Sequence, residues 1–545
     1  MGLFRGKRRS RDATSSGASS IIASIASAVP GPAAAGVFLG APDADLVAAL
    51  RRALPGLTWV ALPDDAVARH RALIAEGPLD LVVDDPDPEG RLRRFNRTFF
   101  QLRPGGVYVI PNGAGELGTQ AGPLGELLQE AAARAEVPLR THSTGMDETR
   151  LRALRSHVRT TVVDGHLVLS HDLPDVHALV REEHLDDLLA AVPTPHRVLA
   201  VHPVGTPPAE PESVEVPQAR VRHDGRPIEP VDLHLRDYRD VVVAPYQLVL
   251  GDRIVLPDTF RHHPQPHLHN KMLAKVAPAF AVPVDPVPDD IPRLDGTYLH
   301  LDNEARAHFG HLLTESLSRV WAWPETLALD PGARVLVCAT VKRPELLEYE
   351  LAIYEAAGIP RDRVVLASGP VRVERLISGT PMFSNPYYVD ARIAATWDQV
   401  GDRLAAGAAP REWPQRVFLS RRETKRACVN GPELEQVFVE HGFEVLFPED
   451  YSLGEQVQLF RAADVIAGFA GSGMFQIAFV AEPKTVIQVG SEAYGPRNEY
   501  LMAAVRRHRL TGIVCQAYDG RGLAADWWYD EQREGPALRA LLAGL

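Results

Sequence analysis

The residues best suited to chemistry follow a short apolar strand in the last third of the chain. Residues Arg416–Leu419 are expected to form this strand, which runs directly into Ser420 and Arg421, with Arg426 close behind. Arginine carries a permanent charge, and its planar group of N–H donors matches the oxygens of a phosphate. The pattern therefore predicts an anion-binding site at the end of this strand.

A second strand, Asp464–Ala467, ends in a glycine-rich turn. It is followed by Gly468, Gly471 and Gly473, with Ser472 between the last two. A strand, a turn of small residues and the start of a helix present free backbone N–H groups, and the helix dipole adds positive charge there. Two such elements on neighbouring parallel strands would suit the diphosphate of a nucleotide-sugar, which indicates a glycosyltransferase.

Residues 308–323 (HFGHLLTESLSRVWAW) place three charged or titratable side chains at intervals of four. A regular α-helix would bring His311, Glu315 and Arg319 onto one face. Apolar residues fill much of the remaining surface, so the polar stripe must find partners or line a cleft. Two interpretations stay open on chemistry alone: a structural ladder with Glu315 between His311 and Arg319, or part of an active site.

Composition places loose bounds on the whole protein. The 545 residues are 45% hydrophobic and 23% charged, which allows about two to four globular domains. A formal net charge of −12 argues against general nucleic-acid binding, which needs a basic surface. Three widely spaced cysteines form neither a disulfide framework nor a zinc motif, which fits a reducing cytoplasm. No apolar run reaches the length of about 18–20 residues that spans a bilayer.

The N-terminal segment 1–32 is basic and then rich in serine and alanine. We expect a disordered tail. Weak contact of its basic residues with the anionic inner face of the cell membrane is an alternative, and a signal peptide is a less favoured one.

Residues 33–190 alternate between strands and helices, with strands expected at Gly36–Gly40, Leu57–Leu62 and Leu79–Asp84. The later part, an acidic strand end, a helix and an LRPGG turn, resembles an S-adenosylmethionine-dependent methyltransferase. The loop after the first strand departs from that family, because 40–43 (GAPD) has a single glycine where close approach to the cofactor needs several. We therefore expect a degenerate Rossmann-like domain, in which Asp84 and Asp85 cap a strand end or, alternatively, bind a cofactor.

A proline-rich region at about 195–292 contains a histidine cluster, TFRHHPQPHLHNK. Imidazoles are common metal ligands. Prolines interrupt the spacing, however, and no carboxylate or cysteine joins it, so a metal site is the least favoured interpretation. A loop lining an acceptor cleft and a solvated loop are the two others. The cluster comprises His262, His263, His267 and His269.

The segment from about 195 to 525 resembles the family 61 glycosyltransferases, found in protein O-glycosylation, plant xylan decoration and bacterial polysaccharide loci. The order and separation of its motifs match the family pattern, although no single motif is diagnostic. One departure is that many members have a histidine before the second glycine of the turn and an asparagine a few residues later, where this chain has Ala470 and Gln476. The matching residues are Phe309, His311, Glu315 and Arg319; Ser420, Arg421, Arg426, Asn430 and Glu433; Ser452, Leu453, Glu455 and Gln456; and Gly468, Gly471, Ser472 and Gly473.

The resemblance implies an α/β fold of GT-B type, with two Rossmann-like halves and an additional Rossmann-like domain before them. Residues 195–405 would form the acceptor half and 406–545 the nucleotide-sugar half. The reaction would be inverting, with His311 or Glu315 as the base and Arg421 and Arg426 on the diphosphate. The predicted substrate-binding set is completed by Arg319, Ser420, Asn430, Glu455, Gln456, Gly471, Ser472 and Gly473.

No metal and no cofactor is expected, because the Asp-x-Asp-like runs at 43–45, 84–87 and 284–290 lie outside the matched motifs. The expected partners are a nucleotide-sugar donor and a glycan or glycoconjugate acceptor, in a cytoplasmic enzyme of bacterial capsule or other cell-surface polysaccharide biosynthesis. Two alternatives remain: a methyltransferase with a sugar-binding module, and a non-catalytic protein of polysaccharide assembly.

Overall fold

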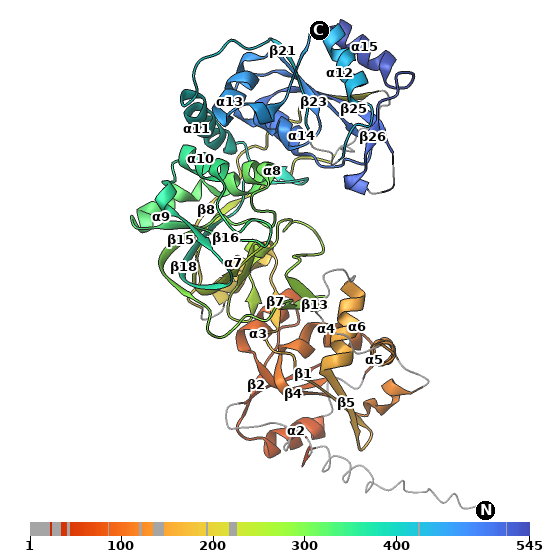
Figure 1. Cartoon of the computed structure of the whole chain (residues 1–545). Helices are drawn as coiled ribbons and strands as arrows, with labels where there is room; N and C mark the ends of the chain where they lie inside the picture. Colours follow the sequence, from red (N-terminus) through yellow and green to blue (C-terminus); the bar gives the residue numbers. More distant parts are fainter. Residues whose placement is uncertain are drawn as a thin grey trace, which may run out of the picture. The chain divides into compact units, whose positions relative to one another are not determined.

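The protein is an α/β protein whose sheets combine parallel and antiparallel strands (Figure 1). The computed structural model describes residues 22–23, 25, 34–40, 44–84, 87–118, 122–134, 146–191, 194–216, 226–422, 426–518, 520 and 522–545. The expected tail at 1–32 lies almost entirely outside these residues, as do Asp43 and Asp85. Within the described ranges, no helix is both long and apolar enough to cross a membrane.

The chain divides into two compact units. The first contains the described residues of Met1–Pro195, Leu248–Thr259 and His267–Ile291. The second contains those of His196–Gln247, Phe260–Pro266 and Pro292–Leu545. The chain therefore returns to the first unit twice after residue 195, and the short segment Phe260–Pro266 belongs to the second unit.

The first unit is built on a sheet with the strand order β2-β1-β3-β4-β6-β5. The strands β2, β1, β3 and β4 are parallel, whereas β6 is antiparallel to both of its neighbours. Apolar side chains of α2 and the central strands form its core. The elements are β1 (Ala34–Leu39), α2 (Ala44–Ala53), β2 (Leu57–Val60), α3 (Ala66–Glu76), β3 (Leu79–Asp84), α4 (Arg91–Thr98), β4 (Leu102–Ile110), α5 (Pro123–Ala132), α6 (Met146–His157), β5 (Val158–Val163), β6 (His166–His171) and α7 (Glu182–Ala191).

A second group of short strands in this unit has the order β13-β14-β7-β12-β11. It joins β7 (His177–Leu179) to the two segments that return to the unit. Those segments supply β11 (Leu248–Leu250), β12 (Ile254–Val255), β13 (Leu273–Ala277) and β14 (Phe280–Pro283).

Asp84, at the end of β3, is held inside the first unit. Its carboxylate accepts a hydrogen bond from the Tyr108 hydroxyl at 2.9 Å and forms an ion pair with Arg94. Burial raises the pKa of Asp84, and these two partners oppose that rise. Because a fully buried carboxylate must be paired, these contacts favour the structural role over cofactor binding.

The first sheet of the second unit has the strand order β8-β10-β18-β15-β16-β17. The strands β18, β15, β16 and β17 are parallel, and β10 is antiparallel to β18 and to β8. Its elements and connections are β8 (Arg197–His202), β10 (Leu233–Ala244), β15 (Arg293–His300), α8 (Phe309–His311), α9 (Ala322–Leu329), β16 (Arg334–Cys338), α10 (Glu348–Ala356), β17 (Val364–Ala367), β18 (Val371–Gly379), β19 (Phe383–Ser384), β20 (Tyr388–Val389) and α11 (Ile393–Ala406).

The second sheet of this unit has the order β22-β21-β23-β24-β25, and these strands are parallel. The strand β9 (Ser213–Val216), from much earlier in the chain, extends it by pairing with β25. The remaining elements are β21 (Arg416–Leu419), α12 (Gly431–Glu440), β22 (Glu444–Leu446), α13 (Leu453–Ala462), β23 (Val465–Phe469), the 3₁₀ helix η8 (Ser472–Phe479), β24 (Thr485–Ser491), α14 (Asn498–Arg506), β25 (Arg509–Ala517), β26 (Trp527–Trp528) and α15 (Gly535–Ala543).

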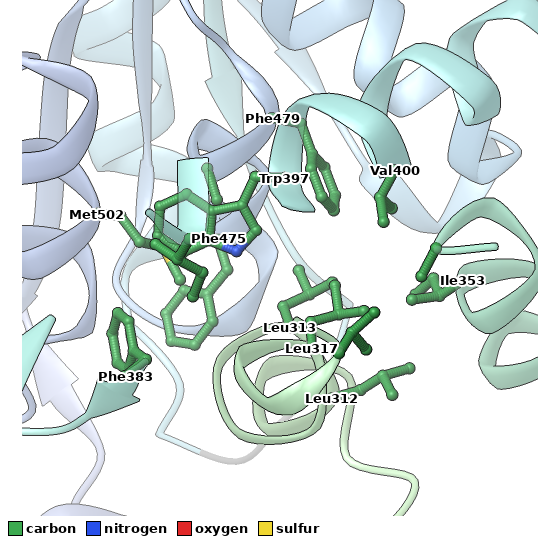
Figure 2. Close-up of a cluster of buried hydrophobic side chains, with 14 of the residues drawn as sticks. Leu312, Leu313, Leu317, Ile353, Phe383, Trp397, Val400, Phe475, Phe479 and Met502 are labelled. Carbon is green, nitrogen blue, oxygen red and sulfur yellow. The ribbon is translucent and has the colours of Figure 1, made fainter. Parts of the chain in front are cut away.

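One hydrophobic core runs through both sheets of the second unit. It includes Leu299 and Val335 from the first sheet and Val417 and Ile466 from the second. Figure 2 shows the joining region, where leucines of the helical segment 312–317 approach aromatic side chains of η8 and α11. Continuous burial of this kind stabilises the relative placement of the two sheets. The joining side chains include Leu312, Leu313, Leu317, Trp397, Phe475 and Phe479.

Candidate active site

The two predicted anion-binding elements leave the same edge of the second sheet. The strands β21 and β23 are adjacent and parallel, with Leu419 paired to Gly468. The strand β22 lies on the outer side of β21, so the chain order reverses between β21 and β23. Ligands of open α/β sheets bind in the crevice at the carboxyl ends of the strands where such a reversal occurs. The loops that begin at Ser420 and Ala470 border this crevice.

The guanidinium groups of Arg421 and Arg426 both approach Gly471. A Cβ atom placed on Gly471 would lie 3.4 Å from Arg426 Nη2 and 3.9 Å from Arg421 Nη1. Arg421 Nη1 also donates to the carbonyl oxygen of Ala470 at 3.4 Å, and its guanidinium lies 5.5 Å from the centre of the Phe469 ring. Two cations thus flank the glycine turn, which is the arrangement that an anion site needs.

The backbone of Arg426 is fixed by a hydrogen bond, whereas its side chain makes fewer contacts. Its φ of 56° lies in the left-handed region, and its carbonyl oxygen accepts from Trp527 Nε1 at 3.1 Å. Its guanidinium lies 5.1 Å from the centre of the Tyr494 ring, while its buried Nε has no hydrogen-bond partner among the described residues. A buried donor without a partner is costly.

The start of η8 faces solvent. Ser472 is partly exposed, Gly473 is exposed, and a Cβ atom on Gly473 would meet no atom within 4 Å. The backbone N–H of Gly471, by contrast, donates to a buried carboxylate oxygen of Glu499 at 2.8 Å. Because the first N–H groups of a helix lack intrahelical partners, Ser472 and Gly473 are the residues of this turn that can offer donors to a ligand.

The titratable pair His311 and Glu315 acquires a partner that the sequence did not indicate. His311 Nδ1 lies 2.7 Å from Glu315 Oε1. Arg261, from the histidine-rich segment, donates through Nε to the same oxygen at 2.7 Å and places Nη2 3.1 Å from His311 Nδ1. The side chains are 22%, 15% and 25% exposed for His311, Glu315 and Arg261. They form a largely buried cluster that still reaches solvent.

Glu315 is a carboxylate throughout the neutral pH range. Burial alone would raise its pKa, but the interactions with His311 and Arg261 lower the pKa of Glu315 to about 2. An ionised carboxylate accepts hydrogen bonds and cannot donate one. We therefore assign the proton of His311 to Nδ1, facing Glu315, which leaves Nε2 with a lone pair that can take a proton from a substrate.

The helix that carries this pair is not a regular α-helix, and Arg319 does not continue the expected ladder. A π-helical turn covers Leu312–Ser316 and a 3₁₀ turn covers Leu317–Arg319, so the four-residue spacing no longer keeps one face. Arg319 is buried and donates to the carbonyl oxygen of Asp302 at 3.0 Å. Arg261, rather than Arg319, is the cation in contact with Glu315.

The histidine cluster is divided between the two units. His262 and His263 belong to the second unit, whereas His267 and His269 belong to the first and are exposed. Burial, with Arg261 nearby, lowers the pKa of His262 to about 4, so its ring is neutral at pH 7. His263 lies with Nε2 3.2 Å from the Tyr388 hydroxyl. Among the described residues, no three His, Cys, Asp or Glu side chains are grouped in a way that could hold a metal ion.

Gly310 joins the two parts of the site. A Cβ atom on Gly310 would lie 2.8 Å from Phe475 Cε2 and 3.0 Å from Ser472 Cβ. Only glycine allows its backbone to approach these two side chains so closely. His311, the next residue, is thereby placed beside the glycine turn that begins η8.

Several other predicted donor-binding residues are engaged in local structure. Asn430 contacts Glu433 and the backbone of Tyr529, and the hydroxyl of Ser420 donates to Glu435 at 2.5 Å. Glu455 forms a capping box with Ser452, the N-cap of α13.

Gln456 donates to the carbonyl oxygens of Pro448 and Tyr451, both at 2.9 Å, and its own side-chain oxygen accepts from Gln476. These contacts favour structural roles for Asn430, Glu455 and Gln456. They also show that Gln476, one of the two departures from the family pattern, is buried against Gln456.

A separate hollow of about 550 Å³ lies on the first sheet's side of the second unit. Its lining includes Trp321, Trp323, His202, Glu325 and Arg392 but none of the predicted site residues. The crevice beside Arg421 and Arg426 is smaller, and it is lined in addition by Ser491, Tyr494 and Trp527.

Sequence reasoning missed Arg261 and Gly310. The HFGH segment carried a signal for Gly310, because an isolated glycine in a buried helix usually has a packing reason. Arg261 carried no comparable signal, because it lies on a loop far from His311 and Glu315 in the sequence and meets them only in the folded protein.

The family model described as Glycosyltransferase 61 matches residues 309–487. A comparison with curated proteins gives no match. The matched segment begins at the helix of His311 and Glu315 and ends beyond the glycine turn, so it covers most of the site assembled above. It lies inside the range 195–525, over which the sequence motifs resembled that family. This chain therefore carries a family 61 glycosyltransferase domain at residues 309–487.

Proposed function

We propose that this protein is an inverting glycosyltransferase that moves a sugar from a nucleotide-sugar to a hydroxyl of a polysaccharide or glycoconjugate acceptor. The observation that carries the proposal is the contact of Gly310 with Ser472 and Phe475. This contact supports the assignment of His311, the residue after Gly310, as a base that acts near the turn of the diphosphate site. Inverting transfer requires both groups close together, because the acceptor attacks the sugar carbon opposite the departing diphosphate.

In this proposal the second unit has a GT-B arrangement. Residues 195–405 supply most of the acceptor half and 406–545 most of the donor half. The single core shared by the two sheets supports a fixed cleft between these halves. The order reversal between β21 and β23 supports the placement of the donor.

His311 acts as the general base. Its Nε2 takes the proton of the acceptor hydroxyl, and the hydroxyl oxygen forms the new bond to the sugar carbon. The bond between that carbon and the diphosphate oxygen breaks, and its electron pair leaves with the nucleoside diphosphate. Glu315 accepts the hydrogen bond from the imidazole Nδ1–H, and Arg261 holds Glu315 in place by donating to the same carboxylate oxygen.

Arg421 and Arg426 stabilise the negative charge that grows on the diphosphate. Ser472 and Gly473 add N–H donors at the start of η8. The two arginines replace the divalent ion that many transferases use, so we propose a reaction that needs no metal and no cofactor. The favoured setting is bacterial cell-surface polysaccharide biosynthesis in the cytoplasm, with membrane contact through the basic N-terminal segment.

Calorimetry with nucleoside diphosphates tests the proposal. We expect UDP, GDP, CDP or TDP to bind the full chain, and we expect Arg421→Ala to weaken that binding. S-adenosylmethionine, titrated in parallel, should not bind. Binding of S-adenosylmethionine would support the methyltransferase alternative, and a chain that binds none of these ligands would fit the non-catalytic alternative.

A further inference from the structure

A fully buried carboxylate lies directly beneath the proposed diphosphate site. Glu499 is 0% exposed and sits in the first turn of α14, where the helix dipole stabilises a negative charge. It lies beyond residue 487, where the family match ends. Its Oε1 accepts from the Gly471 N–H at 2.8 Å and from the Tyr494 hydroxyl at 3.5 Å.

The Gly471 turn needs such a partner to keep its shape. Gly471 has φ 130° and ψ −168°, a region of backbone space that is essentially restricted to glycine. Glycine adopts this conformation without steric cost but is also free to leave it, so a hydrogen-bond partner is what selects it. The hydrogen bond from the Gly471 N–H to Glu499 fixes one side of the peptide unit that links residues 470 and 471.

Arg421 holds the other side of the same peptide unit. Its Nη1 donates to the Ala470 carbonyl oxygen, which points opposite to the Gly471 N–H across the planar peptide. Rotation of this peptide would therefore break both contacts and leave the guanidinium of Arg421 held through Nη2, which donates to the Arg426 carbonyl oxygen. Glu499 thus acts on one of the two hydrogen bonds that orient the Arg421 guanidinium, the one to the Ala470 carbonyl oxygen.

Arg426 is linked to the same carboxylate through Tyr494. The Tyr494 hydroxyl contacts Glu499, and the Tyr494 ring lies beneath the Arg426 guanidinium at 5.1 Å. Both cations of the proposed site are therefore arranged around one buried acceptor. A buried negative charge next to an anion site opposes anion binding by its charge, so its benefit must come from the geometry that it imposes.

We infer that Glu499 is a positioning residue of the diphosphate site. It acts as a hydrogen-bond acceptor that fixes the peptide between Ala470 and Gly471 and thereby aims Arg421 and Arg426 at the ligand. This inference rests on the proposed function, because it assumes that the two arginines bind a diphosphate.

Two conservative substitutions of Glu499 distinguish the effect of its side-chain length from the effect of its negative charge. Glu499→Gln keeps the length and the acceptor oxygen but removes the charge, whereas Glu499→Asp keeps the charge but is too short to reach the Gly471 N–H. The probe is inorganic pyrophosphate, titrated into the full chain by calorimetry at fixed ionic strength. We expect Glu499→Gln to bind within about threefold of wild type or more tightly, and Glu499→Asp to bind at least about tenfold more weakly.

Glu534 provides a matched control in the same half of the unit. It is also 0% exposed, begins a helix and accepts a backbone N–H, from Asp530 at 2.8 Å. Glu534→Asp should lower thermal stability without changing pyrophosphate affinity. Circular dichroism and thermal unfolding show that each variant is folded at the temperature of the titration.

The outcomes distinguish the inference from the proposed function. If wild type does not bind pyrophosphate, or if Arg421→Ala binds it equally well, the donor site itself is misplaced and the inference is overturned with it. If wild type binds, Arg421→Ala does not, and Glu499→Asp binds like wild type, only the positioning role is wrong. The positioning role is also wrong if pyrophosphate affinity depends on the charge at residue 499, so that Glu499→Asp keeps the wild-type affinity and Glu499→Gln changes it several-fold.

Discussion

The backbone of Gly310 packs against the side chain of Ser472, with room for a hydrogen atom but not for a methyl group. A Cβ atom would lie 3.0 Å from Ser472 Cβ and 2.8 Å from Phe475 Cε2. Phe475 belongs to the buried cluster shown in Figure 2, so it cannot move freely aside. This contact sets the separation between the helix of His311 and the turn that begins η8.

Substitution of Gly310 tests how much the activity depends on this contact. Gly310→Ala should destabilise the protein by about 1–3 kcal/mol, because a methyl group must be inserted into a packed region. Turnover should also fall, since His311 shifts relative to the donor turn. The control is Gly369→Ala, where a Cβ atom meets nothing within 4 Å. Urea unfolding and a transfer assay measure the two effects, and an unchanged turnover in a measurably destabilised Gly310→Ala protein would contradict the second.

The two arginines should dominate affinity for nucleoside diphosphates. Arg421→Ala or Arg426→Ala removes a charge-assisted contact worth about 1.5–3 kcal/mol, which corresponds to roughly a ten- to hundredfold loss of affinity. Arg422→Ala is the control, because Arg422 is exposed and paired with Asp450 at 2.6 Å. Calorimetry with folded variants provides the measurement. Equal affinity in all three variants would remove these arginines from the site.

His311→Asn should abolish proton abstraction while it preserves donor binding. Asparagine keeps some hydrogen bonding towards Glu315 but has no basic nitrogen. Turnover should fall by about two to four orders of magnitude, the range of general-base catalysis. Nucleoside diphosphate affinity should stay at the wild-type value, because the hydrogen-bonded partners of His311 are Glu315 and Arg261 and not the two arginines of the proposed diphosphate site. A variant that retains more than about a tenth of the wild-type rate would show that the base lies elsewhere.

The low pKa of Glu315 predicts a specific acid sensitivity. Its folded-state pKa of about 2 lies below the ordinary value of 4.5, so ionisation of Glu315 stabilises the fold at neutral pH. This contribution is complete above the unfolded pKa and is lost as pH falls from 4.5 towards 2. Glu315→Gln cannot titrate. The difference in unfolding free energy between wild type and Glu315→Gln should therefore be largest at neutral pH and should shrink below 4.5. Denaturant unfolding across this range measures it, and a difference that grows on acidification would contradict the assignment.

Chelation should leave turnover nearly unchanged. We expect this because cations and helix N-termini surround the proposed diphosphate site. The assay compares rates before and after EDTA treatment, and again after Mn²⁺ is added. Complete loss with EDTA and recovery with Mn²⁺ would show that a carboxylate ligand set exists, and the acidic segment around Asp289 would be examined first.

Local patterns in the sequence were sufficient to predict the elements with strong local signals. The strand β21 has the predicted bounds, because strand formation depends on neighbouring residues. The strand β23 was predicted at Asp464–Ala467 and spans Val465–Phe469, so Gly468 lies in the strand and the turn follows it. The family resemblance, carried by motifs spaced along the chain, is confirmed over residues 309–487. The pairing of His311 with Glu315 also followed from their spacing on one helical segment.

The side chains that complete the site are brought together by packing between distant segments. Arg261 reaches Glu315 from a loop 54 positions earlier in the chain, and Gly471 is held by Glu499, 28 positions later. Contacts at such separations depend on how whole elements pack, which no local pattern encodes. Packing also redirected Arg319: the π-helical turn at Leu312–Ser316 rotates it away from Glu315 and towards the Asp302 carbonyl, because buried leucines fix the helix against both sheets.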